Sequence, residues 1–151
     1  DTTRKTAAAD TSQVATQPSP AHVVNPAEAQ QLYDAAYQDL VKGQFELARQ
    51  GFQHYLETEP TGALADNAHY WVGESHYSQK NYEAAMQEFS VVLEKFSEGD
   101  KVPSAMLKLA YAQIASGKTA EGKKNLEALI KRFPQSNEAN LARARLKELG
   151  R

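Results

Sequence analysis

The 151-residue chain contains no cysteine, which excludes disulfides, thiolate metal ligands and a cysteine nucleophile. It also has no long apolar run, so the sequence predicts no segment inserted in a membrane. An excess of one charge is missing too, because 17 Lys and Arg residues face 19 Asp and Glu residues, for a net charge of −2. No basic field is therefore present to attract nucleic acid or anionic lipid.

β-Branched residues are sparse from residue 27 onward, where Ala, Glu, Gln, Leu and Lys dominate. This composition predicts an all-α domain over residues 25–151. We expect its first helix to begin at Asn25, because Asn suits the N-cap position and Pro26 suits the first helical position.

Residues 1–24 contain no aromatic residue and no sustained apolar period. A segment of this composition buries too little apolar surface to offset the entropy lost on ordering. We predict a disordered low-complexity linker over residues 1–24. Because the chain starts at Asp1 without a signal-type apolar segment, we expect a processed chain or a fragment.

Similar side chains recur along the chain at one offset, 37 residues. The clearest columns are small residues at Ala36, Gly73 and Ala110, large apolar residues at Phe52, Phe89 and Leu126, and helix-ending positions at Pro60, Ser97 and Pro134. Each unit contains two helical patterns joined by a tight turn, and a small residue where two helices cross lets their axes approach closely. We predict repeats over about residues 29–62, 66–99 and 103–136, with a capping helix over about 137–149.

These columns resemble the tetratricopeptide (TPR) signature, a helix–turn–helix unit of ~34 residues. The resemblance implies an α-solenoid of three hairpins plus the capping helix, wound into a right-handed superhelix with the first helix of each pair on its concave wall. The predicted partner-binding residues on that wall are Tyr33, Tyr37, Asn67, Tyr70, Glu74 and Tyr111. Tyrosine combines a stiff contact area with a hydrogen-bonding hydroxyl, which suits a binding surface.

A structural role is the open alternative for each of these tyrosines, since any of them can pack between adjacent helices. Tyr77 and Tyr82 are predicted to lie in the core, because their columns hold Leu, Ile and Phe. Trp71 is predicted to wedge between hairpins. The wall offers few Lys, Arg or Asn residues, so a clamp for the acidic tails of chaperones is disfavoured.

Signals for an enzyme are weak. His69 and His76 lie seven residues apart on one predicted helix, with Glu74 nearby, but zinc requires an i, i+4 pair or a third converging ligand. We therefore predict no catalytic residue, no metal and no cofactor, and a function in protein binding.

The block Ala68-His69-Tyr70-Trp71-Val72-Gly73-Glu74, with Phe133-Pro134 and Ser136 further on, resembles the C-terminal TPR domain of the YbgF/CpoB family. Its members are periplasmic proteins of Gram-negative bacteria encoded with the Tol-Pal system. The resemblance covers about residues 25–149 and implies a periplasmic protein that binds TolA. It further implies contacts with the peptidoglycan-synthesis machinery, coordination of outer-membrane constriction with peptidoglycan synthesis during cell division, and a trimeric coiled coil preceding this segment.

Assembly lipoproteins of the BamD type share similar TPR sequences. The alternative function is therefore that of a structural TPR subunit in an outer-membrane assembly complex.

Overall fold

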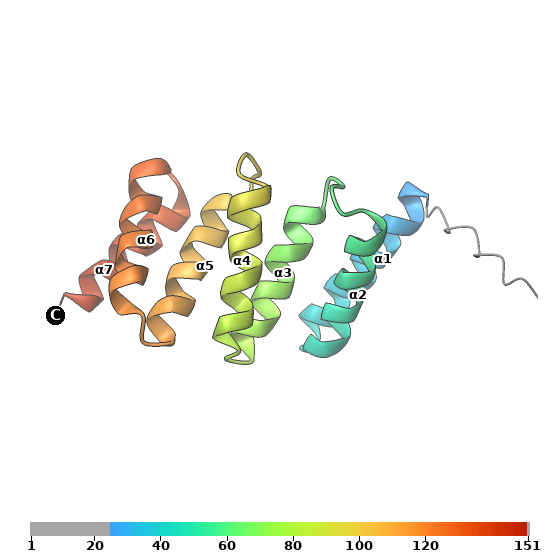
Figure 1. Cartoon of the computed structure of the whole chain (residues 1–151), viewed down its shortest axis with the longest axis horizontal. Helices are drawn as coiled ribbons and strands as arrows, with labels where there is room; N and C mark the ends of the chain where they lie inside the picture. The colour runs from blue at the N-terminus through green and yellow to red at the C-terminus, as the bar shows by residue number, and fades with distance from the viewer. Residues whose placement is uncertain (1–24, 151) are drawn as a thin grey trace, which may run out of the picture.

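The computed structural model describes residues 25–150, and this part of the chain folds into seven helices without a strand (Figure 1). The helices are α1 (Pro26–Val41), α2 (Phe45–Thr58), α3 (Ala65–Ser78), α4 (Tyr82–Lys95), α5 (Val102–Ala115), α6 (Thr119–Arg132) and α7 (Asn137–Leu149). The predicted all-α solenoid is confirmed. The predicted linker over residues 1–24 lies outside the described residues.

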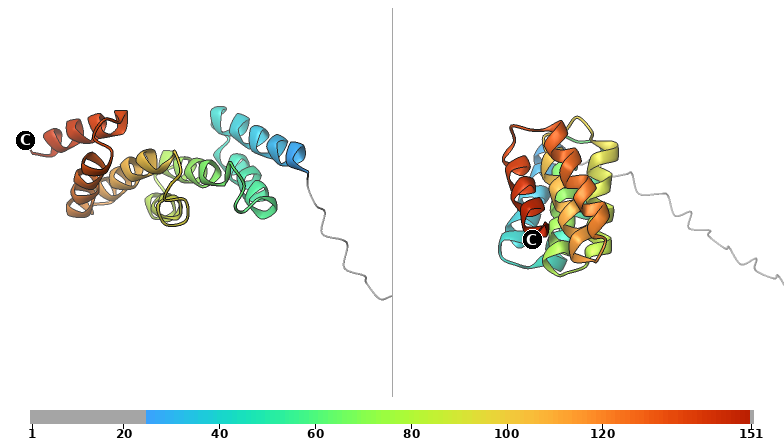
Figure 2. Two further views of the ribbon diagram at one scale, coloured as in Figure 1. Left: turned by 90° about the horizontal axis from the view of Figure 1, so that it is seen from above. Right: turned by 90° about the vertical axis from the view of Figure 1, so that its left-hand side faces the viewer.

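The helices form three hairpins, α1–α2, α3–α4 and α5–α6, followed by α7, which packs on α5 and α6. Each odd-numbered helix also touches the next odd-numbered helix, α1 with α3, α3 with α5 and α5 with α7. In the part of the chain that the structure describes, α2, α4 and α6 do not pack directly on one another. Figure 2 shows the result: α1, α3, α5 and α7 surround a hollow side, and α2, α4 and α6 lie on the outer side of the curve. The even-numbered helices are therefore spread apart by the curvature that brings the odd-numbered helices together.

Local sequence signals start the first and last helices. Asn25 Oδ1 accepts a hydrogen bond of 2.9 Å from the Glu28 backbone N–H, and the Asn25 N–H donates back to Glu28 Oε2, so the predicted N-cap is confirmed as a capping box. At α7, Ser136 Oγ accepts a 3.0 Å hydrogen bond from the Ala139 N–H. Both caps satisfy backbone donors that the first turn of a helix leaves unpaired.

The repeated columns make the core. Phe52, Phe89 and Leu126 are fully buried, one in each hairpin. Gly73 lets α3 approach α4, because a Cβ atom there would lie 2.6 Å from Cε1 of Phe89. Trp71 packs against both the first and the second core cluster, which confirms its predicted position between hairpins.

Candidate functional site

We call the surface that α1, α3, α5 and α7 form on the inner side of the curve in Figure 2 the hollow face. One column of this face, Trp71, Lys108 and Arg145, recurs at the 37-residue spacing. Each member of the column lies beside a predicted site residue on the preceding odd-numbered helix. The pairs are Tyr37 with Trp71, Glu74 with Lys108, and Tyr111 with Arg145.

The end of the hollow face near α1 is aromatic. The Trp71 indole N–H donates a 2.9 Å hydrogen bond to the Tyr33 hydroxyl, and the Tyr37 ring meets the Trp71 ring edge-on with centroids 5.3 Å apart. Tyr33 is half-buried against Phe52, whereas Tyr37 is 38% exposed. Tyr37 is thus the more open ring of this end, and Tyr33 and Trp71 hold the surface beside it in place.

Tyr70 is buried more deeply than we expect for a predicted partner-binding residue. It is 7% exposed, and its ring packs against Phe89 and Trp71 at centroid distances of 5.7 and 5.0 Å. Burial raises the pKa of its hydroxyl, and the nearby Glu74 carboxylate adds to the effect. Tyr70 therefore supports the wall and offers little surface to a partner.

Lys101 covers the Tyr70 and Trp71 rings, with its ammonium 5.2 and 4.9 Å from their centroids. Such contacts are worth about 0.5–1 kcal/mol at exposed sites. Sequence reasoning missed this residue, because it precedes α5 and the equivalent position of the previous repeat holds Leu64. No pattern in the chain shows that its side chain reaches back over α3.

Asn67 and Glu74 add buried acceptors to the hollow face. Glu74 Oε1 pairs with the Lys108 ammonium, whose Nζ lies 3.2 Å away, whereas Asn67 Oδ1 is buried without a hydrogen-bond donor among residues 25–150. A buried acceptor left without a donor costs about 1–3 kcal/mol. This cost applies to Asn67 Oδ1, which a bound segment cannot reach without rearranging the wall, because the atom is fully buried.

The opposite end of the hollow face is a pocket of about 320 Å³ between α3, α5 and α7. It is lined by Tyr77, Tyr111, Ala115 and Arg145. Burial raises the pKa of the Tyr111 hydroxyl, and this effect outweighs the nearby Arg145 guanidinium, which lowers that pKa. The phenol therefore stays protonated and can donate a hydrogen bond. Tyr77 packs against Tyr82 as predicted for a core residue, but it is only half-buried and also forms a wall of this pocket.

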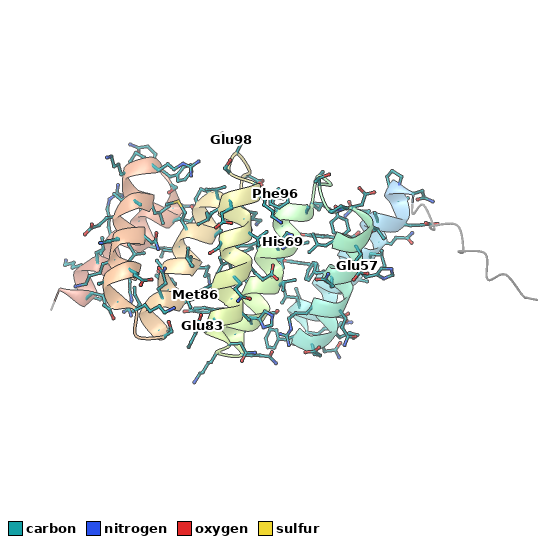
Figure 3. All side chains as sticks on the ribbon, in the orientation of Figure 1. Glu57, His69, Glu83, Met86, Phe96 and Glu98 are labelled. Carbon is teal, nitrogen blue, oxygen red and sulfur yellow. The ribbon has the colours of Figure 1, made fainter. Side chains whose placement is uncertain are left out.

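His69, Glu74 and His76 do not form one site. His69 pairs with Glu88 through a 2.8 Å contact between Nδ1 and Oε2, and it stacks beside Phe96 on the outer side, where Figure 3 labels both rings. His76 lines a groove next to α2, while Glu74 pairs with Lys108 on the hollow face. Residues 25–150 contain no group of three His, Cys, Asp or Glu side chains placed to hold a metal ion.

None of the helices α1–α7 combines the length and the apolarity needed to cross a bilayer.

Stacked helical hairpins with a hollow face lined by their first helices define a TPR-type solenoid, a class whose members act as protein-interaction modules. The chain belongs to the YfiO outer membrane lipoprotein family, whose match covers residues 63–144. This membership indicates a protein of the cell envelope.

Among solved structures, the chain is similar to the first TPR domain of Spaghetti (RPAP3) bound to the HSP90 peptide SRMEEVD. The TM-score is 0.67 at 16% sequence identity, and the alignment covers 86% of this chain and 99% of that chain. The likeness shows the TPR fold. No curated protein matches the chain.

Proposed function

We propose that the chain is a protein-interaction module of the cell envelope that binds a segment of a partner protein on its hollow face. In this proposal it works without catalysis or a cofactor, in the periplasm of a Gram-negative bacterium. Its partner is TolA, as in the YbgF/CpoB family that the sequence resembles. It then helps coordinate outer-membrane constriction with peptidoglycan synthesis during cell division, together with the peptidoglycan-synthesis machinery.

One observation carries the proposal: the hollow face is lined by tyrosines beside the column of Trp71, Lys108 and Arg145. Trp71 packs against Tyr37, the Lys108 ammonium lies 5.0 Å from the centroid of the Tyr77 ring, and Arg145 lines a pocket with Tyr111. Rings positioned beforehand lose little conformational entropy on binding, which favours affinity. Tyr37 at one end and Tyr111 at the other are the contact residues that we assign first, and Asn67 and Glu74, on α3, are the further predicted contact residues of this wall. Tyr33 and Tyr70 act mainly by supporting this surface.

Calorimetric titration of the chain with the periplasmic domains of TolA tests this function. Replacing Tyr37 or Tyr111 by Ala is expected to weaken binding about tenfold or more, since a tyrosine that acts as a hot spot of an interface carries roughly 2 kcal/mol or more. Leu47→Ala is the matched control, because Leu47 is 50% exposed but lies on α2, on the outer side. Equal binding by all three variants, or no binding by the unaltered chain at tens of micromolar, would contradict the proposal.

The family membership favours a second candidate, a structural TPR subunit of an outer-membrane assembly complex of the BamD kind. The two candidates differ in the partner that the chain retains. Co-purification with components of the outer-membrane β-barrel assembly machinery, and not with TolA, would select the second.

A further inference from the structure

The outer side of the solenoid contains a second surface with a chemistry different from that of the hollow face. Because α4 and α6 do not pack on each other, a groove of about 460 Å³ opens between them, with α5 at its floor. Met86 and Val91 of α4 and Leu109 of α5 give the groove an apolar lining, beside the polar side chains of Gln87, Ser90 and Gln113. Figure 3 faces this side and labels Glu83 and Met86 near the end of the groove where α4 begins.

The rim of this groove is acidic. Glu83, Glu94 and Glu121 line it, and Lys118 is the one cation among the lining residues. Lys118 Nζ is already paired with Glu83 Oε1 at 3.2 Å. Glu94 and Glu121 have no ion-pair partner in the described part of the chain, so two carboxylates remain available.

The length of the groove and the hydrogen bonding of its backbone indicate which kind of peptide segment can bind there. Glu83 and Glu94 are eleven residues apart on α4, which corresponds to about 16 Å, or three turns of a helix. The groove walls are helices whose backbone groups are bonded internally, so they offer no edge to which a strand could hydrogen-bond. A helix satisfies its own backbone and can lay an apolar face into such a groove.

We propose that the α4–α6 groove is a docking site for an amphipathic basic helix of a partner protein. Its apolar face covers Met86, Val91 and Leu109, and its lysines or arginines reach Glu94 and Glu121. Charge complementarity of this kind steers association and sets orientation. The site lies on the side opposite the hollow face, so the domain can hold two partners at once and bridge them.

The probe for this site is a synthetic amphipathic helical peptide of about 14 residues, with leucines on one face and lysines at both ends. Titrated into the ¹⁵N-labelled full chain, it is expected to shift the amides of Met86, Val91 and Leu109, with an affinity that falls as salt is raised. The double variant Glu94→Lys/Glu121→Lys should raise the Kd about tenfold, as expected for two surface charge contacts turned repulsive. Glu57→Lys/Glu127→Lys is the matched control: it reverses two exposed charges, on α2 and α6, outside the groove and should change the Kd less than about twofold.

Circular dichroism on each variant checks that the helices are intact. The proposal is overturned if the peptide does not bind, if an analogue with glutamates in place of the lysines binds equally, or if the shifts fall on α1 and α3. It is also overturned if the two double variants bind alike. Tyr37→Ala should leave this Kd unchanged, so failure here is distinguishable from failure of the hollow-face function.

Discussion

Single residues close the turns inside the hairpins. Gly43 and Gly117 adopt positive φ values of 76° and 90°, and Lys80 occupies the equivalent place in the second hairpin with φ of 62°. A residue with a Cβ atom pays about 1–2 kcal/mol in this left-handed region, whereas glycine enters it freely. The second hairpin therefore carries backbone strain that the other two avoid.

Lys80→Gly is expected to stabilise the chain by about 0.5–1 kcal/mol, because relief of the strain exceeds the added entropy of the unfolded glycine. Gly117→Ala is the reciprocal control and should destabilise by a similar amount. A Cβ atom at Gly117 would meet no atom within 4 Å, so packing does not enter that comparison. Urea unfolding measures both, and a Lys80→Gly midpoint at or below that of the unaltered chain would refute the assignment.

His76 makes stability depend on pH. Burial lowers its pKa from the ordinary 6.5, and the Arg49 guanidinium lowers it further. The unfolded chain therefore binds a proton at His76 more readily than the folded chain. Its contribution to stability is complete above pH 6.5 and is lost as the pH falls below that value.

The free energy of unfolding of the unaltered chain should therefore fall between pH 7.5 and 5.5. His76→Gln should reduce the fall, because the glutamine does not titrate. Denaturant titrations at the two pH values give the comparison, and equal falls in the two proteins would show that His76 is not the source.

At the scale of helices, small residues set how closely two axes approach. Gly73→Ala should cost about 1–3 kcal/mol, because the new Cβ atom would lie 2.6 Å from Cε1 of the fully buried Phe89 ring. Gly150→Ala is the control, since a Cβ atom there meets its nearest neighbour at 3.6 Å, an ordinary contact. Thermal unfolding of both variants decides the matter, and a Gly73→Ala protein as stable as the control would contradict the packing account.

The helices were predictable because their signals are local or periodic. Asn25 and Ser136 are residue types that favour the N-cap position, and the 37-residue spacing of Ala36, Gly73 and Ala110 indicates where the two helices of each hairpin cross. The depth of each side chain in the hollow face was not predictable, because it depends on the next repeat. Tyr70 is covered by Lys101 and Trp71 and is 7% exposed, whereas Tyr33, at the same position of the first repeat, is only half-buried.

At the scale of the whole molecule, each hairpin contacts only its neighbours. The stability of one hairpin therefore depends on the residues that pack between it and the next hairpin. Trp71 is such a residue, since it joins Tyr33 by a hydrogen bond and Tyr37 by ring contact. The first hairpin therefore depends on the second for its stability.

Trp71→Ala should destabilise the chain by about 3 kcal/mol and accelerate amide exchange mainly in α1 and α2. Leu129→Ala, at a fully buried position on α6, should place the acceleration at the opposite end instead. Hydrogen exchange read by mass spectrometry separates the two cases. Acceleration spread evenly over all helices in both variants would refute a chain of nearest-neighbour contacts.

The central claim, that the hollow face holds the partner, is tested most directly with the periplasmic domains of TolA, the proposed partner, by mapping which helices they contact. In an amide NMR titration of the ¹⁵N-labelled chain, we predict shifts concentrated on α1, α3 and α5, with the largest near Tyr37 and Tyr111. Shifts confined to α2, α4 and α6, or no shifts at all, would contradict it.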